Sequence, residues 1–374
     1  MGKRRTHSRP TIADVAKLAG VGAVTVSRAL RDPEKVSERL RDAINSAIRE
    51  LNYVPDLNAR ALASLRTDIV GVLVPSLTQN IFSDVVRGIY DGLEDSPLRI
   101  ELSNTRYNPD LEEEQVFRLL RHAPAAIIIS GIEQKPSTRR MLETAGCPVV
   151  QIMDLTDDPI QKIIGFSHER AGYAMTRHLI ESGYRRIAFF SGWMNTRANQ
   201  RREGWRRALE EAGLYDPALV GQMGNEDPES SQGAKTDYHQ FSTAMMGREL
   251  MLSMLDRKVD VDAVFCVNDV LSLGVLFACN LRGIEVPRQV GIAGFNDFDY
   301  MAAAHPPLTS IRIHRWRCGY EAMRSVREQI KTGEIGERVV DLGFDIARRA
   351  STDRLGTLQP VEEPPEETMP FMRG

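Results

Sequence analysis

Two short segments with helical apolar spacing, joined through Gly20-Val21-Gly22, limit most strongly how the N-terminal end of this chain can fold. Thr11, followed three residues later by Asp14, forms a capping-box pattern that predicts a helix beginning near Ile12. Gly20 suits a left-handed helix stop, and the next helical pattern, residues 23–30, follows almost at once. So tight a connection predicts a helix-turn-helix pair.

The second and third helical segments complete a small three-helix unit. Val26, Ala29 and Leu30 can face the first helix, which places a different set of residues outside. These outward residues are Ala23, Val24, Ser27 and Arg28. Ser37 is expected to cap a third helix. The residues of that helix at core spacing are Leu40, Ile44, Ile48 and Leu51.

Positive charge is concentrated at the N-terminal end of the chain. Residues 1–66 contain 13 Lys and Arg against 7 Asp and Glu, a net charge of +6, whereas the other 308 residues contain 35 and 44, a net charge of −9. A basic end on an acidic chain suits a partner that carries phosphates, such as nucleic acid. For Lys3, Arg4, Arg5 and Arg9, a solvated tail is an equally open interpretation.

Composition places the rest of the chain among globular proteins with two or three domains, since 42% of the 374 residues are hydrophobic and 26% are charged. No apolar run approaches the ~20 residues of a membrane span, and the N-terminus lacks the apolar stretch of a signal peptide. We therefore expect a cytoplasmic protein without a membrane partner. Four scattered cysteines without CxxC spacing predict no metal site and no disulfide framework, and we expect no cofactor.

From Asp68 onward, short β-branched runs alternate with helical patterns. The first runs are Ile69–Val74 and residues 125–130 and 149–153, and after Gly165 the alternation restarts with runs at residues 186–190, 263–267 and 290–293. This rhythm predicts parallel sheets, and the restart predicts two doubly wound lobes. Ligands of such sheets bind at the carboxyl ends of strands, so a ligand site is expected in the cleft between the lobes.

Polar residues follow several of these predicted strands. They include residues 75–80 after the first strand, Asp154, Asn268 and Asn296, and Arg201 lies on the helix after residues 186–190. Taken singly, each residue suits a helix cap or a turn, and Asp269 could cap the helix that follows it. Their convergence on one cleft favours a site that reads hydroxyl groups, with Arg201 as a bidentate partner for an anion or a hydroxyl.

Taken in order, several motifs resemble the lactose/galactose repressor family of bacterial transcription regulators. The matching motifs are Thr11-Ile-Ala-Asp-Val-Ala, Ala19-Gly-Val, Thr25-Val-Ser-Arg28, Leu51-Asn-Tyr-Val-Pro55, Asn268-Asp269 and Pro306-Pro-Leu-Thr-Ser310. The resemblance runs from about Thr11 to Ala350. Within the family, residues 72–80, 87–89 and 164–166 are most similar to the gluconate-utilization repressor branch.

The resemblance implies an all-α helix-turn-helix domain that binds operator DNA, followed by a periplasmic-binding-protein-like α/β core. Arg28 matches a position that contacts guanine in the major groove, and Leu62 matches one that wedges between base pairs in the minor groove. The implied DNA-binding set is Thr11, Ala23, Val24, Thr25, Ser27, Arg28, Asn58, Ala59 and Leu62. Gly22 departs from the family, which commonly has Ser there, so the operator sequence does not carry over by analogy.

For the small-molecule effector, the resemblance implies a pocket between the lobes. The implied residues are Ser76, Gln79, Asn80, Phe82, Asp154, Phe166, Arg201, Asn268 and Asn296, with Phe166 as a stacking wall. Asn296 stands where many sugar-binding relatives have Asp, which makes an acidic sugar more acceptable beside Arg201. Gluconate or a related aldonic, keto-aldonic or phosphorylated acid is therefore expected. His168 is either a second positive partner or a structural residue.

The predicted domains are residues 1–66 with a hinge helix at about 58–64, a two-lobed core at 67–350, and a disordered tail at 351–374. Because a single helix-turn-helix reads few bases, a homodimer on a palindromic operator is expected, and repression is favoured over activation. Other open interpretations are a regulator that responds to a neutral sugar, a solute-binding module and a sugar enzyme. No GxSxG, HExxH, phosphate loop or strand-linked GxGxxG occurs, which argues against catalysis and leaves no catalytic residue to assign.

Overall fold

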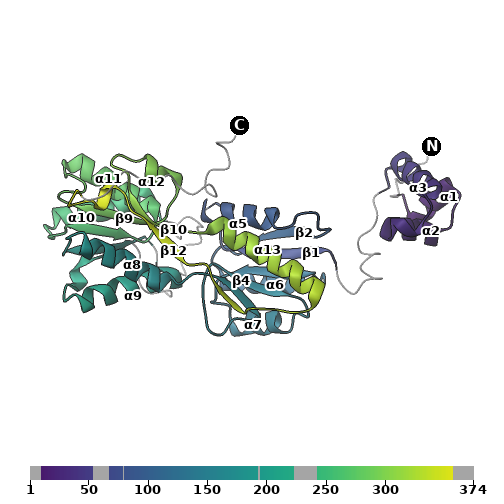
Figure 1. Cartoon of the computed structure of the whole chain (residues 1–374), viewed down its shortest axis with the longest axis horizontal. Coiled ribbons are helices and arrows are strands. Elements are labelled where there is room, and N and C mark those ends of the chain that lie inside the picture. The colour runs from purple at the N-terminus through teal and green to yellow at the C-terminus, as the bar shows by residue number, and fades with distance from the viewer. Residues whose placement is uncertain (1–9, 54–66, 79, 193, 223–241, 357–374) are drawn as a thin grey trace, which may run out of the picture. The chain divides into compact units, whose positions relative to one another are not determined.

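The computed structural model describes residues 10–53, 67–78, 80–192, 194–222 and 242–356. The chain divides between Thr67 and Asp68 into two compact units, which we call the headpiece and the core unit. Figure 1 shows the headpiece as α1, α2 and α3, and the core unit as two sheets with their covering helices. Within the described ranges, no helix combines the length and the apolarity that crossing a membrane requires.

The headpiece has the predicted helix-turn-helix geometry. Its described elements are α1 (Ile12–Ala19), α2 (Ala23–Arg31), a 3₁₀ turn (Pro33–Lys35) and α3 (Glu38–Leu51). The predicted capping box is confirmed, because the Thr11 side chain accepts from the Asp14 backbone N–H and the Asp14 side chain accepts from the Thr11 N–H. Gly20 adopts the left-handed conformation, with φ of 67°, that ends α1.

Two details of the third helix differ from the prediction. Leu40 is 37% exposed, whereas Ile44 and Ala47 are buried beneath α1 and α2. The two shorter helices cover only part of the 14-residue α3, and Leu40 lies in its uncovered first turn. Ser37 holds the N-cap position, but its side chain makes no capping hydrogen bond.

The core unit contains the predicted two lobes, each built on a sheet. Lobe 1 has the strand order β11-β5-β4-β3-β1-β2, and all its neighbouring strands are parallel. Lobe 2 has the order β12-β10-β9-β8-β6-β7, with β12 antiparallel to β10. The strands are β1 (Ile69–Val74), β2 (Arg99–Asn104), β3 (Ala126–Ser130), β4 (Val149–Ile152), β5 (Lys162–Gly165), β6 (Ile187–Ser191), β7 (Val220–Gln222), β8 (Ala263–Cys266), β9 (Gly291–Asn296), β10 (Thr309–Ile313), β11 (Val339–Asp341) and β12 (Phe344–Ala347).

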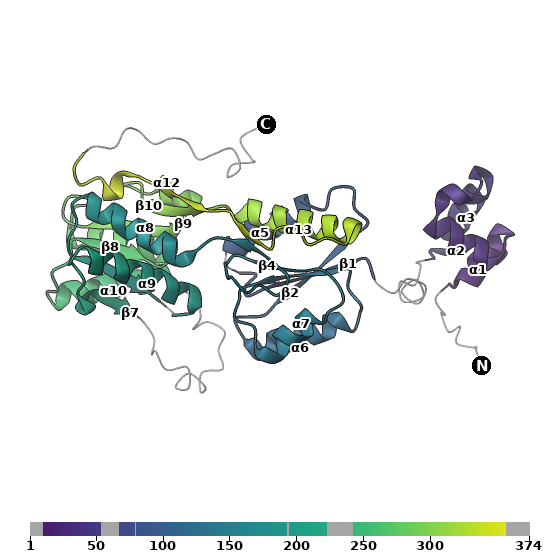
Figure 2. The same cartoon turned by 60° about the horizontal axis from the view of Figure 1, so that its bottom comes forward.

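Helices cover both faces of each sheet. In lobe 1, α5 and α13 lie together on one face, and α6 and α7 lie on the other (Figure 2). The lobe 1 helices are α5 (Asn80–Asp91), α6 (Pro109–Leu120), α7 (Pro136–Glu143) and α13 (Arg315–Thr332). The lobe 2 helices are α8 (His168–Glu181), α9 (Thr196–Glu211), α10 (Ala244–Asp256), α11 (Asp269–Arg282) and α12 (Asp299–Ala303), with 3₁₀ turns at Pro217–Leu219 and Ala350–Thr352.

The α8–α9 pair in lobe 2 packs closely at two glycines. A Cβ atom on Gly204 would lie 2.1 Å from the backbone oxygen of Glu169, and one on Gly172 would lie 2.3 Å from that of Arg201. Neither helix could approach the other this closely with larger residues at these positions. The contact fixes α9, which carries Arg201, against the rest of lobe 2.

The chain passes between the lobes after β5, after β10 and after β11. For this reason α13 and β11 belong to lobe 1 although lobe 2 precedes them in sequence. After β12, Ser351 donates to the Ile292 carbonyl at 2.6 Å and Thr352 contacts His178, so the packed chain continues beyond residue 350 through Thr352. Residues 357–374 of the predicted tail lie outside the described residues.

Candidate functional site

The outer face of α2 exposes the residues predicted to read DNA. Ala23, Ser27 and Arg28 are exposed, and Val24 is 72% exposed although its side chain is apolar. Val26 on the opposite side is fully buried, so packing fixes which side of α2 faces outward. Thr25 is half-buried, and the Thr11 side chain caps α1. Asn58, Ala59 and Leu62 lie outside the described residues.

A cavity in the core unit lies where the strands of both lobes end. It consists of two adjoining hollows of about 610 and 580 Å³, counting space that opens to solvent. Both hollows are lined by Tyr107, Asn195 and Arg197. The first, which we call the acidic compartment, also has Glu112, Glu133 and Asp154 in its wall. The second, the basic compartment, also has Arg201, Asn268 and Asn296.

Arg201 is the central side chain of the basic compartment. It is 6% exposed, and it donates to the Val267 carbonyl at 2.5 Å and to His168 Nδ1 at 3.2 Å. Its guanidinium carbon lies 3.6 Å from the centroid of the Phe295 ring. Burial and the neighbouring Arg197 lower the pKa of Arg201 to about 9, so it remains positive at neutral pH. Among the described residues, no carboxylate forms an ion pair with Arg201.

His168 orients Arg201 and is not a second cation. Burial and the charge of Arg201 lower the pKa of His168 to about 4, so its ring is neutral at physiological pH. Its Nε2 atom lies 3.0 Å from the Met153 carbonyl, and this contact leaves Nδ1 as the acceptor for Arg201. These contacts favour the interpretation of His168 as a structural residue over that of a second positive partner for the effector.

Arg197, which the sequence prediction missed, joins the two lobes across the cavity. From α9 of lobe 2 it donates to Asp154 of lobe 1, with Nε–Oδ2 and Nη2–Oδ2 distances of 2.9 and 2.5 Å, and to Ser130 Oγ at 3.0 Å. Burial acts to raise the pKa of Asp154, but Arg197 and His168 hold that pKa below its usual range. Arg197 precedes Arg201 by one helical turn, so the i, i+4 spacing was a signal that could have identified it.

Asn268 and Asn296 complete the basic compartment from the ends of β8 and β9. The Asn268 side chain caps α11 by accepting from the Leu271 N–H at 3.1 Å. Asn268 therefore caps α11 in place of Asp269, which accepts from Ser310 and from the Phe298 N–H instead. Asn296 has φ of 118°, and its Oδ1 is buried without a hydrogen-bond partner. A strained residue with an unsatisfied polar atom is frequent where a ligand binds.

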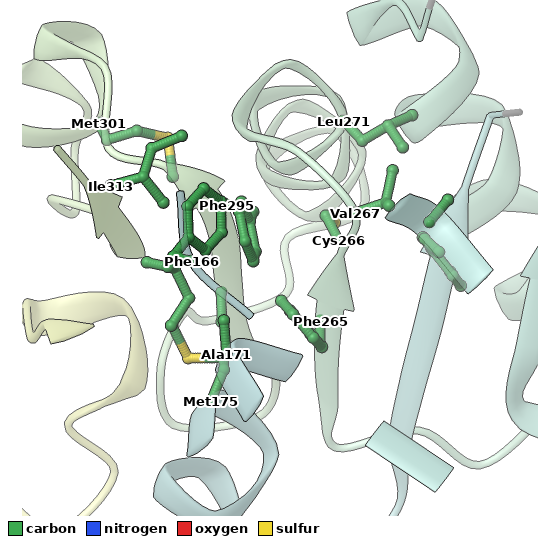
Figure 3. Close-up of a cluster of buried hydrophobic side chains, with 14 of the residues drawn as sticks. Phe166, Ala171, Met175, Phe265, Cys266, Val267, Leu271, Phe295, Met301 and Ile313 are labelled. Atoms are coloured by element: carbon green, nitrogen blue, oxygen red, sulfur yellow. The ribbon is translucent and has the colours of Figure 1, made fainter. Parts of the chain in front are cut away.

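Several predicted effector residues lie outside the wall of the cavity. Phe82 is 1% exposed in the hydrophobic core, and Ser76 is buried in a turn where it contacts Thr78. The Phe166 ring packs in a cluster of buried hydrophobic side chains with Phe295 (Figure 3), and its centroid lies 6.1 Å from that of Phe295 and 4.4 Å from that of the His168 ring. Asn80 begins α5 and is exposed, and Gln79 lies outside the described residues.

The acidic compartment contains carboxyl groups that the sequence prediction did not include. Burial and the neighbouring Glu133 raise the pKa of Glu112 to about 7, and partial burial together with Asp154 raises the pKa of Glu133. The Tyr107 hydroxyl between the compartments also has a raised pKa because it is buried. Within the described ranges, no group of three or more His, Cys, Asp or Glu side chains could hold a metal ion.

Models of known protein families match residues in both units. The family model for bacterial regulatory proteins of the lacI family matches residues 11–56, which include α1, α2 and α3. A model for the periplasmic binding protein-like domain matches residues 176–352 of the core unit.

The chain is similar to whole proteins as well as to separate domains. It is 37% identical over 348 residues to the HTH-type transcriptional regulator GntR of Pseudomonas aeruginosa, covering 93% of this chain and 97% of that protein. It is 31% identical to the HTH-type transcriptional regulator GntR of Escherichia coli K12, covering 91% of this chain and 97% of that protein. A crystal structure of a LacI family transcriptional regulator from Silicibacter pomeroyi superposes with a TM-score of 0.82 at 33% identity, covering 92% of this chain and all of that chain.

These relatives are regulators rather than enzymes, and they match from the headpiece through the core unit. The exposed face of α2 and the polar cavity between the lobes therefore belong to a regulator with one DNA-binding unit and one effector-binding unit. The chain belongs to the lacI family of bacterial regulatory proteins and is a DNA-binding transcriptional regulator.

Proposed function

We propose that this regulator represses genes of sugar-acid metabolism and that a sugar acid, gluconate or a close relative, controls its operator affinity from the cavity between the lobes. The observation that carries the proposal is the guanidinium of Arg201, which is buried and lines the cavity without a carboxylate partner among the described residues. A buried charge is stable only when it is compensated, and an effector carboxylate would supply the missing negative charge.

The neighbours of Arg201 favour an acid over a neutral sugar. In the basic compartment, the described wall contains Arg197 and Arg201 but no acidic side chain. The unpartnered Oδ1 of Asn296 can accept from a hydroxyl of the same ligand. A carboxylate with a hydroxyl group beside it would satisfy Arg201 and Asn296 together. The names of the GntR relatives agree with the resemblance to gluconate-utilization repressors that the sequence displays.

We place the proposed effector where it can change operator affinity. Because Arg197 of lobe 2 already bonds to Asp154 and Ser130 of lobe 1, a ligand bound beside Arg197 would alter how firmly the lobes close. Operator affinity changes only if the ligand binds one closure state more tightly than the other. In the proposed direction, the ligand favours the state that releases DNA.

Operator binding is proposed to require a homodimer. Phe277 and Leu281 lie one turn apart on α11 and are 51% and 65% exposed, which suits an apolar contact with a second copy. Two headpieces would then read the halves of a palindromic operator, with Arg28 at the base edges. Asn58, Ala59 and Leu62 are assigned to a hinge helix that is too short to persist alone and orders on DNA, where Leu62 wedges between base pairs.

Calorimetric titration of the full chain with gluconate, 2-ketogluconate, 6-phosphogluconate and neutral sugars tests the effector, and mobility-shift assays with its own promoter test the operator. At least one sugar acid should bind and weaken the shift, while neutral sugars should do neither. In Arg201→Met, effector affinity should fall by about a hundredfold or more, because the ligand carboxylate loses its charged partner. Operator affinity without effector should be unchanged.

Arg206→Met is the matched control, since Arg206 lies on the same helix but is 44% exposed and pairs with Glu203. It should bind the effector like the parent protein. Undiminished sugar-acid affinity in Arg201→Met, or equally tight binding of a neutral sugar, would contradict the proposed effector. Failure to prefer any symmetric promoter sequence would contradict the proposed operator function.

A further inference from the structure

The two compartments of the cavity carry opposite charge, and the following inference rests on the proposed function. The basic compartment contains Arg197 and Arg201, whereas the acidic compartment contains Glu112, Glu133 and Asp154. Arg197 lies in the wall of both. A ligand that fills the whole cavity therefore meets positive charge at one end and carboxyl groups at the other.

Among the described residues, no cation is paired with the carboxyl group of Glu112 or Glu133, although the charge of Arg197 acts to lower the pKa of Glu133. Arg197 is bonded to Asp154, and Lys135, the nearby lysine, is bonded to Asp110 and Glu113 on the outer side of α6. Among the described residues, no side chain forms an ion pair or a hydrogen bond with the carboxyl group of Glu112 or Glu133. Their acceptor atoms are therefore available to a ligand.

We infer that Glu112, supported by Glu133, is a charge-specificity residue that restricts the effector to a polyhydroxy acid with a single anionic group. The carboxylate of the effector lies at Arg201 with the neighbouring hydroxyl group at Asn296, and the uncharged hydroxylated end of the effector lies at Glu112. Hydroxyl groups can donate to the Glu112 carboxyl, whereas a second carboxylate or a phosphate at that end would face like charge in a half-buried site. Specificity then comes from a repulsive element as well as from an attractive one.

Independent evidence that a ligand occupies this cavity comes from its other end. Asn296 is 6% exposed, lines the basic compartment, and has a buried Oδ1 atom without a partner. Arg201 is equally buried beside it, with neutral groups as its hydrogen-bond acceptors. The acidic compartment is thus one end of a cavity whose opposite end offers a positive charge to an anion and an unsatisfied acceptor to a hydrogen-bond donor.

We call this preference for an effector with a single negative charge the charge filter. It should depend on pH through the protonation state of Glu112. Burial and Glu133 raise the pKa of Glu112 to about 7, and the other charged groups in the same compartment are Asp154 and Arg197. As pH rises through this value, Glu112 becomes anionic and repels a second negative group more strongly. Discrimination between one and two negative charges should therefore be stronger near pH 8 than near pH 6.

Gluconate and glucarate are the matched ligands for the test, because they share a six-carbon hydroxylated chain and differ in whether the far end is a hydroxymethyl group or a carboxylate. Calorimetric titration of the full chain near pH 8 should give at least about tenfold tighter binding of gluconate, with 6-phosphogluconate rejected in the same way. Glu112→Gln should reduce this ratio by about fivefold or more, because glucarate binds more tightly once the like charge at its far end is removed. Glu114→Gln, a 52% exposed position on the same helix, is the control and should leave the ratio unchanged.

The outcomes separate this inference from the proposed function. If gluconate binds but glucarate binds equally well, or if Glu112→Gln leaves the ratio unchanged, the charge filter is overturned while the sugar-acid effector stands. If none of the acids binds, both are overturned. Should Glu112→Gln fail to fold, the parent protein titrated near pH 6 and near pH 8 gives a second measurement, since both ligands keep their charge over this range. A gluconate-to-glucarate ratio that does not increase with pH would then overturn the filter.

Discussion

The headpiece and the core unit place their functional side chains in opposite environments. The headpiece exposes its candidate contacts on the outside of α2, where Val24 is 72% exposed, whereas the core unit keeps Arg201 at 6% exposure. A surface helix can meet a rigid duplex without rearrangement of its own unit. A buried guanidinium can meet a ligand only where several strand ends from two lobes converge.

The two units also differ in what stabilises them. The headpiece core consists of a few residues around Val15, Val26 and Ile44, whereas the core unit buries one large apolar cluster that includes Phe189, Trp205 and many others. Small units have little stability to lose, so a single cap matters to the headpiece, while the core unit is sensitive to errors in close packing. Substitutions that act on one unit and leave the other intact therefore test the comparison.

The largest effect is expected for Gly204→Val in the core unit. Because a Cβ at this position would lie 2.1 Å from the Glu169 backbone oxygen, α8 and α9 would have to separate. We expect a loss of about 3 kcal/mol or more, seen as a fall of roughly 6–12 °C in the thermal transition of the core unit. Scanning calorimetry of the full chain measures both transitions, and that of the headpiece should be unchanged.

Arg206→Val is the control for Gly204→Val, because it places the same β-branched residue on an exposed part of the same helix. It should lower the transition by only a degree or two. If the two variants behaved alike, close packing between α8 and α9 would not be the cause. If the headpiece transition also moved, the two units would not be energetically independent.

The contrast between the units explains which parts of the fold could be predicted from sequence. In the headpiece, the Thr11 cap and the Gly20 stop are local signals, and the predicted helix starts at Ile12 and Ala23 are confirmed. In the core unit, β2 was not predicted, because Arg99–Asn104 is a polar strand at the edge of its sheet. The membership of α13 in lobe 1 could not be predicted, since it depends on packing against α5, which lies more than two hundred residues earlier.

The same distinction applies to the cavity. Asp154, Arg201, Asn268 and Asn296 all lie in its wall, because each follows a strand or lies on the helix after one. Arg197 was missed although its spacing from Arg201 was visible in the sequence. Glu112 had no such signal, because it lies in the first turn of α6, where an acidic residue ordinarily stabilises the helix start. Only the folded arrangement brings Glu112 into the wall of the compartment that adjoins the one lined by Arg201.

The next effect concerns acid stability of the core unit. His178 is buried beside Thr352, and burial together with Arg348 lowers its pKa to about 4. Since this is below the unfolded value near 6.5, its neutral form stabilises the fold fully above about pH 6.5, and this contribution is lost as pH falls through 4. Between these pH values, the parent protein should lose roughly 3 kcal/mol of its free energy of unfolding through His178. His178→Gln should not show this loss.

Urea unfolding of the core unit at a series of pH values measures the contribution of His178, with parent and variant compared at each pH. His168, which is also buried, contributes the same pH dependence to the unfolding of both proteins. Because the described part of the headpiece has no buried histidine, the free energy of unfolding of the headpiece should change less with pH. Identical pH slopes in parent and variant would show that His178 does not couple to folding.

A moderate effect is expected on the exposed side of the comparison. Arg28→Ala should weaken operator binding by about 10- to 100-fold, because a bidentate contact with a base is worth roughly 1–3 kcal/mol. Effector affinity and headpiece stability should not change, since Arg28 is exposed. Mobility-shift titrations at fixed salt measure the loss, and Arg49→Ala on α3 controls for the removal of one positive charge. Equal losses of operator affinity in the two variants would indicate that Arg28 contacts phosphates and does not read a base.

The smallest effect is expected at Thr11, where folding and DNA contact overlap in the headpiece. Thr11 caps α1 and is also a predicted DNA-binding residue, so Thr11→Ala should cost about 1 kcal/mol of headpiece stability. Thr11→Ser keeps the capping oxygen, and exposed Ser46→Ala on α3 serves as the control. Chemical unfolding of the headpiece and operator titration should give parallel losses if Thr11 acts only through its cap. If Thr11→Ser kept full stability but lost operator affinity, the Thr11 side chain would contact DNA directly. One residue at the start of α1 would then both stabilise the headpiece and bind DNA, and the two roles would not be separate there.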